Sequence, residues 1–158
     1  MTIKYVNHNK DYKLSKHGNW TDLAVSKTYE MAYLEHQLLD LGISMKLPKW
    51  YKAELKPRSS TFQKFSIIMT NSVGEIDTEY CGHNDRWKFS ALSLNRSYTG
   101  YYVNTFIKKN SRIAQFTIKL REDAPWYIKI KDLFTNYKFK EVDVLTDTNR
   151  GGFGSTGN

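Results

Sequence analysis

The sequence predicts an all-β domain with one short helix. Segments rich in β-branched and aromatic residues recur along the chain, separated by glycine, proline, asparagine and aspartate. Its 158 residues, 40% of them hydrophobic, suffice for one packed core. The helix is expected to run to Phe65, because the preceding Ser59, Ser60 and Thr61 carry hydroxyls that can cap a helix N-terminus.

Short apolar or alternating stretches predict strands in the N-terminal half, at residues 3–6, 41–48 and 51–55. Residues 10–19 are charged and contain a glycine, which predicts a loop. Asp22 precedes an apolar pair and is expected on local grounds to be a turn or cap residue. Residues 28–41 are ambiguous, because apolar side chains at helical spacing predict an amphipathic helix there: Met31, Leu34, Leu38 and Leu41.

The central stretch, residues 71–87, is interpreted as a hairpin that presents one acid, Asp77. Strand-forming side chains alternate with turn residues along it: Val73, Ile76, Tyr80 and Trp87 with Gly74, Gly82, Asn84 and Asp85. The glycines let backbone approach a ligand closely, and Tyr80 can place a ring beside whatever Asp77 contacts. Simple turn chemistry is the local alternative.

Further strands are predicted at residues 111–118, at 126–144, and on both sides of a loop at 95–97 within residues 88–105. Arg112 and Gln115 are the larger polar exceptions in the first of these. Tyr98, Tyr101 and Tyr102 lie near cations and fit either a stacking surface for nucleic acid or packing, of which packing is favoured.

Composition narrows the functional classes. Lysine and arginine number 24 against 16 acids, which fits a polyanionic partner such as nucleic acid, a membrane surface or a nucleotide. The cations are dispersed, so a soluble basic surface without such a partner fits the charge equally well. The single cysteine, Cys81, excludes an internal disulfide and a cysteine-based zinc site. The four histidines show no ligand spacing. Without a signal peptide or an apolar run of membrane-spanning length, a cytoplasmic protein is expected.

Two polar segments fit phosphate binding. Arg58 with Ser59 and Ser60 offers a guanidinium fork, hydroxyls and backbone N–H groups, although these residues taken alone favour a simple helix cap. The last nine residues, 150–158, contain four glycines together with an arginine, a phenylalanine and a Ser–Thr pair. A terminal linker has little use for Phe153 or Arg150, so a phosphate- and base-covering role is favoured.

Taken together, five ordered segments resemble the motifs of the trimeric dUTPases, and of the phage-encoded type. The segments are residues 22–23, 57–60, 74–82, 111–115 and the glycine-rich tail, and the third and fifth are the specific ones. The resemblance implies a distorted jelly-roll or β-barrel at residues 1–145 and a flexible arm at residues 146–158. It also implies a homotrimer with shared active sites, each closed by an arm from another chain, in the host cytoplasm.

The resemblance further implies hydrolysis of dUTP to dUMP and pyrophosphate with Mg²⁺. Asp77 would activate the water that attacks the α-phosphorus, Asp22 would hold hydrated magnesium through water, and Tyr80 would pack against the deoxyribose. Phe153 would stack on uracil. The substrate-binding set would be Arg58, Ser59, Ser60, Asn71, Gly74, Ile76, Tyr80, Gln115, Arg150, Phe153, Gly154, Ser155 and Thr156.

Several positions depart from the family pattern. Trp20 and Thr21 precede the first acid, Ser60 replaces a glycine and Cys81 an arginine, residues 83–87 form a local extension, and Arg150 lies two residues closer than usual to the phenylalanine. The helical pattern at residues 28–41 conflicts with the family, which has strands there, and we follow the family.

Other functions remain open alternatives. A dCTP deaminase-like enzyme on the same fold would carry a glutamate on the strand after Asp77, and residues 88–94 contain no acid. A nucleotide-gated regulatory module or a nucleic-acid binder fits the net charge of +8, but a binder needs no water-activating base. The sequence does not identify a regulatory protein or DNA partner.

Overall fold

The computed structural model describes residues 1–96, 99–145 and 147–152, which form thirteen strands and two short helices. The all-β prediction is therefore confirmed, with one helix more than expected. The strands are β1 (Thr2–Asn7), β2 (Ser15–His17), β3 (Trp20–Ala24), β4 (Tyr29–Met31), β5 (His36–Asp40), β6 (Ile43–Lys46), β7 (Tyr51–Pro57), β8 (Ile67–Met69), β9 (Gly74–Ile76), β10 (Lys88–Ser93), β11 (Thr105–Ile107), β12 (Arg112–Leu120) and β13 (Lys138–Glu141). The helices are α1 (Thr61–Phe65) and α2 (Trp126–Asp132).

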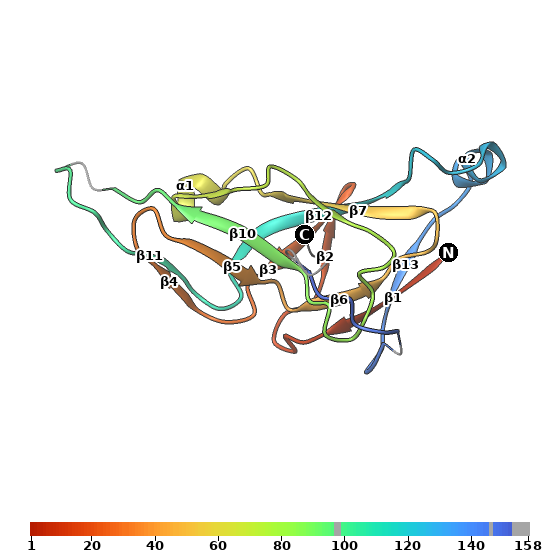
Figure 1. Cartoon of the computed structure of the whole chain (residues 1–158), viewed down its shortest axis with the longest axis horizontal. Helices are drawn as coiled ribbons and strands as arrows, with labels where there is room; N and C mark the ends of the chain where they lie inside the picture. Colours follow the sequence, from red (N-terminus) through yellow and green to blue (C-terminus); the bar gives the residue numbers. More distant parts are fainter. Residues whose placement is uncertain (97–98, 146, 153–158) are drawn as a thin grey trace.

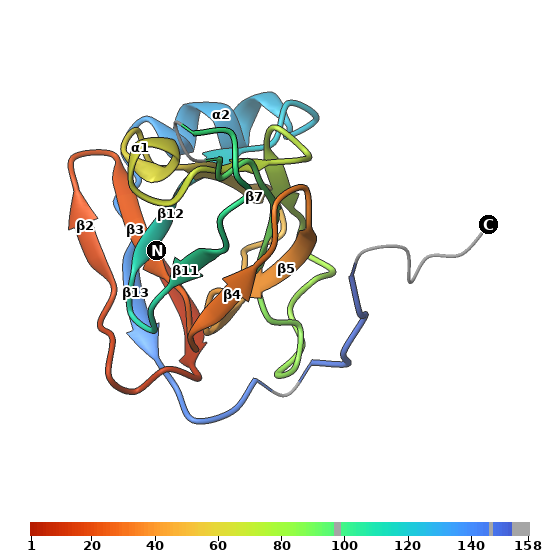
Figure 2. The same cartoon turned by 90° about the vertical axis from the view of Figure 1, so that its left-hand side faces the viewer.

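The strands form four small sheets, in the orders β13-β1-β6, β5-β10-β8, β11-β4 and β2-β3-β12-β7-β9. Figures 1 and 2 show the sheets curving around one interior, with both helices on the same side of the molecule. The core draws on every sheet and centres on large, fully buried side chains. Trp87 and Phe116 meet edge to face there, with ring centroids 5.0 Å apart. No helix in the described part of the chain is long and apolar enough to span a membrane.

The longest strand, β12, organises the five-stranded sheet. From Ala114 onward, Phe116 and Ile118 are buried and the polar side chains between them are less buried, as a period of two requires. The register shifts near the start of the strand, where Ile113 and Ala114 are both buried. β12 pairs antiparallel with both β3 and β7, and this register sets Gln115 opposite Asp22 on one side and Lys56 on the other. The outer face of this sheet therefore gathers polar residues from three strands that are distant in sequence.

Residues 28–41 form β4 and β5, so the strand interpretation is confirmed and the local helical pattern is wrong. Met31 is fully buried, whereas Leu34 is 57% exposed in the turn between the strands and has a φ of +62°. A helix would have placed both side chains on one apolar face. Pairing with β10 and β11 decides the conformation instead.

Three local expectations are wrong. The predicted loop at residues 10–19 contains β2, whose pairing with β3 a charged sequence does not reveal. Asp22 lies within β3, paired with β2 and β12, rather than at a turn or cap, and Arg58 and Arg112 compensate its buried charge there. Residues 126–144 include α2, which starts directly after Pro125, in addition to the expected strand material at β13.

The central stretch is not a self-paired hairpin. Its only strand, β9, pairs with β7, and residues 77–87 form a loop of turns and bends, called here the Asp77 loop. Gly74 is needed for packing, since a Cβ at this position would lie 3.2 Å from the Leu55 Cβ and 3.3 Å from the Met69 Cε. The glycine therefore serves the close approach of β9 to β7 in this chain.

Candidate functional site

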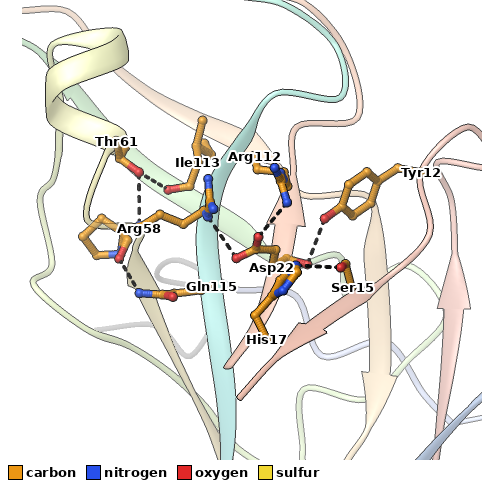
Figure 3. A network of polar contacts seen from close by, with 10 residues as sticks. Tyr12, Ser15, His17, Asp22, Arg58, Thr61, Arg112, Ile113 and Gln115 are labelled. Atoms are coloured by element: carbon orange, nitrogen blue, oxygen red, sulfur yellow. Dashed lines mark hydrogen bonds and ion pairs between the residues drawn. The ribbon is translucent and has the colours of Figure 1, made fainter. Parts of the chain in front are cut away.

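A buried carboxylate with two arginine partners marks the outer face of the five-stranded sheet (Figure 3). The Asp22 side chain is only 5% exposed. Arg58 Nε donates to its Oδ1 at 2.9 Å, and Arg112 Nη1 donates to its Oδ2 at 3.2 Å. Both oxygens are therefore occupied, and the buried charge is compensated twice over. We call Asp22, Arg58, Arg112 and Gln115 the Asp22 cluster.

The segment that carries Arg58 is fixed by Thr61. Its hydroxyl, in a residue only 1% exposed, donates to the Ile113 carbonyl at 2.6 Å and accepts from the Arg58 N–H at 3.1 Å. Gln115 Nε2 donates to the Pro57 carbonyl at 3.1 Å from the other side. The cap predicted from the serines is wrong in detail, because Ser60 makes no side-chain capping bond to α1.

The charge balance of the Asp22 cluster suits an anion. Two guanidinium groups share one carboxylate, which leaves a net positive charge on the outer face of the sheet. The Arg112 side chain is 46% exposed, so part of its donor fork faces solvent. Arginine forks match the oxygens of phosphate groups. Sequence reasoning noted Arg112 only as a polar exception in a strand and missed its place in this cluster.

Asp77 follows β9 and is held by hydrogen bonds to both oxygens. Its Oδ1 accepts the backbone N–H groups of Glu79 at 2.9 Å and Tyr80 at 3.1 Å. Its Oδ2 accepts Arg150 Nη1 at 2.7 Å. The side chain is still 51% exposed, and each carboxylate oxygen has a second lone pair that can accept a proton from water.

These contacts determine the ionisation of Asp77. Partial burial raises its pKa, but the hydrogen bond from Arg150 and those from the Glu79 and Tyr80 N–H groups outweigh burial, so the net shift is downward. Asp77 is therefore a carboxylate over the whole neutral range. A carboxylate at a solvent-facing position can accept a proton, as a general base must.

Tyr80 packs its ring against the core, and its hydroxyl donates to the Arg86 carbonyl at 2.8 Å. Burial, followed by the charges of Asp85 and Asp40, raises its pKa to about 12, so the phenol stays neutral. The chain passes close to this ring again near its end, since a Cβ on Gly152 would lie 3.1 Å from the ring. Tyr80 therefore offers a ring to pack against and does not act as an acid at neutral pH.

The last described residues, 147–152, dock on the Asp77 loop and are called here the arm root. Asp85 accepts the backbone N–H groups of Arg150 and Gly151, and Asn149 Oδ1 accepts the Asn84 N–H at 2.7 Å. The sequence marked Asn84 and Asp85 only as turn residues, so this contact was missed. Of the predicted arm residues, Phe153, Gly154, Ser155 and Thr156 lie outside the described residues.

The chain brings the predicted site residues together in two separate groups. In the β7–β9 register Ile76 pairs with Ala53, so the next residue, Asp77, lies beside Lys52. Lys52 is near the start of β7, whereas Arg58 directly follows its last residue, six positions later in the chain. At a strand rise of about 3.3 Å per residue, the Asp22 cluster and Asp77 are on the order of 20 Å apart. Of the remaining predicted ligands, Ser59 and Asn71 are exposed and Ile76 is half-buried.

A pocket of about 410 Å³ lies beside Asp77. Its walls combine acidic and basic side chains from β7, β9 and the segment after β12, and they include Lys52, Ile76, Asp77 and Arg121.

Of the tyrosines considered for nucleic-acid stacking, Tyr102 stacks on Tyr33, with ring centroids 4.4 Å apart. Tyr98 lies outside the described residues.

The side chains of the candidate site do not form a metal site by themselves. Among the described residues, no group of three or more histidine, cysteine, aspartate or glutamate side chains is placed to hold a metal ion. Both oxygens of Asp22, the expected holder of hydrated magnesium, are engaged by arginines. The Asp22 cluster fits an anion better than a cation.

Comparison with known proteins gives consistent results, although no protein-family model matches the chain. The chain is 39% identical over 157 residues to the SPbeta prophage-derived deoxyuridine 5′-triphosphate nucleotidohydrolase of Bacillus subtilis, covering 98% of this chain and 96% of that protein. It is 34% identical over 123 residues to the deoxyuridine 5′-triphosphate nucleotidohydrolase of Rickettsia prowazekii, covering 77% and 68%.

Solved structures share the fold at lower sequence identity. The dUTPase of Streptococcus mutans superposes with a TM-score of 0.66 at 16% identity, over 79% of this chain and 99% of that one. The dUTPase of Staphylococcus bacteriophage 80alpha gives a TM-score of 0.64 at 16% identity, over 78% and 92%. The order of strands built from this sequence is therefore an architecture that these enzymes share.

Proposed function

The chain belongs to the dUTPase family and hydrolyses dUTP to dUMP and pyrophosphate, and we propose that it does so at sites shared between copies of the chain. The full-length identity of 39% to a curated dUTP nucleotidohydrolase carries the substrate and the reaction. The separation of Asp77 from the Asp22 cluster, on the order of 20 Å within one chain, supports the shared site. A homotrimer, as the family resemblance implies, supplies both groups to each site.

Asp77 is the proposed general base. It accepts a proton from a water molecule as that water attacks the α-phosphorus, and the bond from the α-phosphorus to the bridging oxygen breaks to release pyrophosphate. Its lowered pKa keeps the carboxylate ionised at neutral pH, and its half-exposed position leaves lone pairs for the water. Tyr80 is proposed to pack against the sugar.

The Asp22 cluster is the proposed phosphate end of the site. Arg58 and Gln115 keep the roles expected from the sequence, and Arg112 is added, because its half-exposed guanidinium shares the same carboxylate. Asp22 then acts by orienting the two arginines. The other predicted substrate contacts remain part of this proposal: Ser59, Ser60, Asn71, Gly74, Ile76, Arg150, and the arm residues Phe153, Gly154, Ser155 and Thr156.

Magnesium is proposed to arrive with the substrate. One structural neighbour, the dUTPase of phage phi11 of S. aureus, is described with a structural Mg(II) ion. In this chain both Asp22 oxygens pair with arginines, so Asp22 would act on the phosphates through Arg58 and Arg112 rather than through a hydrated metal ion. Bound with the substrate, Mg²⁺ would supply charge neutralisation, and the chain's own residues would supply orientation and proton transfer.

Pyrophosphate release from dUTP, dTTP, dCTP, dATP and dGTP, with and without Mg²⁺, tests the proposal. We expect turnover of dUTP and little of the others. Asp77→Asn should lower kcat by about 10²–10⁴-fold while the Kd for dUTP changes little, because the base is lost and the pocket remains. Asp143→Asn, at another exposed aspartate, is the control. Deamination of dCTP, or an Asp77→Asn variant as fast as the parent, would overturn the assignment.

A further inference from the structure

The Tyr80 side chain is held at both of its ends. Its backbone N–H donates to Asp77 Oδ1 at 3.1 Å, and its hydroxyl donates to the Arg86 carbonyl at 2.8 Å. A tyrosine held only by its backbone can turn about its side-chain torsions, whereas a bond at the hydroxyl also fixes the far end of the ring. The position of the ring therefore depends on the position of Arg86.

The Arg86 carbonyl belongs to a peptide unit that is bonded on both sides. Trp87, which supplies the N–H of this unit, is fully buried and donates that N–H to the Ile43 carbonyl at 2.8 Å. The Trp87 carbonyl accepts the Leu41 N–H at 2.9 Å. The acceptor of the Tyr80 hydroxyl is therefore tied to the backbone of the core and is not a freely moving loop carbonyl.

The Arg86 side chain adds a second tie. Its Nη1 donates to Asp40 Oδ2 at 2.6 Å, in an ion pair whose side chains are 38% exposed for Arg86 and 17% exposed for Asp40. Because the pair is partly shielded from water, it is expected to hold more firmly than an ion pair at the open surface.

Asp40 is a firm support because all of its polar groups are engaged. It ends β5, which pairs with β10. Its other carboxylate oxygen, Oδ1, accepts the Gly42 N–H at 2.7 Å. Its own N–H donates to the Tyr29 hydroxyl at 2.7 Å, and its carbonyl accepts the Ser26 N–H at 2.9 Å. The contacts that end at the Tyr80 hydroxyl thus start on a paired strand.

We infer that Asp40 and Arg86 are positioning residues that hold the Tyr80 ring in place beside the sugar, so that the ring excludes a 2′-hydroxyl. The inference rests on the proposed function, in which Tyr80 packs against the deoxyribose. It also gives a role to residues 83–87, the local extension beyond the family pattern, since this segment supplies both Arg86 and Trp87.

Rigidity matters because the substrate and its ribose counterpart differ by one hydroxyl. An apolar pocket rejects an added hydroxyl by only about 10²-fold, so a wall that can retreat loses much of that discrimination. A ring tied to β5 through Arg86 cannot retreat without breaking the ion pair or the hydroxyl bond.

The ratio of kcat/KM for dUTP to kcat/KM for UTP measures this discrimination. Tyr80→Phe keeps the ring and removes the tether, Arg86→Gln breaks the ion pair, and Asp40→Asn removes its negative charge. We expect each to lower the ratio by about tenfold, mainly by raising kcat/KM for UTP, while kcat/KM for dUTP falls less than about threefold. A variant that only lost folded protein would lose turnover of both substrates, so it could not lower the ratio.

Two further variants are matched controls. Arg86→Lys keeps the charge and one donor, which suffices for the single Nη1 contact, and it should restore most of the ratio. Lys10→Gln breaks an ion pair of similar length, with Nζ 2.8 Å from Glu141 Oε1, and it should leave the ratio at the parent value. A lowered ratio in Lys10→Gln would show that the ratio responds to any lost ion pair, and would overturn the inference.

A double variant tests whether Arg86 acts through the Tyr80 hydroxyl. When Tyr80→Phe is already present, adding Arg86→Gln should not lower the ratio further, because the tether is already gone. A further drop would show that Arg86 shapes the pocket or contacts the nucleotide by itself, and would overturn its role as a positioning residue.

The same measurements separate this inference from the proposed function. A parent that does not cleave dUTP would refute the proposed function. A parent that cleaves dUTP and rejects UTP, with an unchanged ratio in Tyr80→Ala, would refute the sugar contact of Tyr80 and the inference with it. A lowered ratio in Tyr80→Ala, with the parent ratio in Arg86→Gln and Asp40→Asn, would overturn the positioning role alone.

Discussion

Asp22 and Asp77 are both aspartates bound by arginine, yet they differ in burial and in the elements that hold them. Asp22 lies within β3, is 5% exposed, and its partners stand on or beside the paired strands β7 and β12. Asp77 lies in a loop, is 51% exposed, and its partner comes from the arm root. The ion-pair distances are similar, 2.9 Å for Arg58 and 2.7 Å for Arg150. The two pairs therefore differ in how deeply the carboxylate is buried and in how firmly the arginine is held, and not in their length.

The comparison separates a preorganised end of the site from an adjustable one. Backbone pairing along β3, β12 and β7 fixes the Asp22 cluster before any ligand arrives. The Asp77 loop and the arm root depend on a few hydrogen bonds between loops, which open at lower free-energy cost than paired strands. In the proposed site, phosphates would therefore bind to a rigid surface, while the Asp77 loop could adjust to the rest of the nucleotide.

The largest effect on stability is expected from Asp22→Ala. Breaking a buried ion pair leaves uncompensated charge, here on Arg58 and Arg112. Since these arginines are 23% and 46% exposed, water relieves part of the cost, and we expect a loss of about 2 kcal/mol. Thermal unfolding should show Tm lower by roughly 4–8 °C. Because both guanidinium groups lose their orientation, turnover of dUTP should fall as well.

Asp77→Ala is the matched counterpart. Its pair with Arg150 is exposed, so Tm should stay within about 2 °C of the parent while turnover is lost. If Asp77→Ala destabilised the chain as much as Asp22→Ala, the distinction between a preorganised and an adjustable end would fail.

Thr61→Val tests the support behind Arg58. Valine keeps the shape but removes a buried hydroxyl that joins the Arg58 N–H to the Ile113 carbonyl. The Arg58 N–H still has the Ile113 carbonyl at 3.2 Å, so the loss should be about 1 kcal/mol. We expect a small drop in Tm, and a rise in KM for dUTP if Arg58 binds phosphate. Thr61→Ser, which keeps the hydroxyl, should restore KM, and failure to do so would point to packing alone.

Strands were predictable from the sequence where apolar and polar residues alternate along them. At residues 28–41 the family resemblance predicted strands although the local pattern is helical. Residues 114–118 show the period of two in β12, and residues 51–55 do so in β7. β2 and α2 were missed for opposite reasons. A charged strand at a sheet edge has no apolar face to detect, and Trp126 to Asp132 is rich in strand-forming residues although it forms a helix after Pro125.

The candidate site was predictable as a set of residues but not as an arrangement. Asp22, Arg58 and Gln115 were expected in one site, and they meet at the outer face of one sheet. That Asp77 is remote from them depends on the β7–β9 pairing, which no local pattern in the sequence encodes. Asp85 resembled an ordinary turn residue because its arm donors are backbone N–H groups, and these leave no signal in side-chain chemistry.

The pH dependence tests the adjustable end. The hydrogen bond from Arg150 contributes to the lowered pKa of Asp77, so kcat/KM should lose activity on the acid side only below the ordinary range of aspartate. Arg150→Gln should move this acid limb to higher pH, because burial still raises the pKa and the guanidinium no longer lowers it. In the parent, the stability gained from the lowered pKa is present above the unfolded-state pKa and is lost as pH falls through the folded-state value.

Arg121→Gln is the control for this shift. Arg121 is also bound to an exposed aspartate, Asp123, with Nη2 2.6 Å from Oδ2, but it makes no hydrogen bond or ion pair with Asp77. Its removal should leave the acid limb in place. An acid limb that is identical in the parent and in Arg150→Gln would show that Arg150 does not set the ionisation of the base.

The smallest effect is expected from Asn149→Ala, which removes a bond as short as that of Thr61 but in an exposed setting. Asn149 Oδ1 accepts the Asn84 N–H at 2.7 Å, against 2.6 Å from the Thr61 hydroxyl to its carbonyl. Water replaces an exposed partner, so the free energy of unfolding should change by less than about 0.5 kcal/mol. Trypsin cleavage at Arg150 should rise only slightly, because Asp85 still holds two N–H groups of the arm root. A large increase would mean that Asn149, and not the buried Asp85, holds the arm root, and that exposure does not decide how strongly it is held.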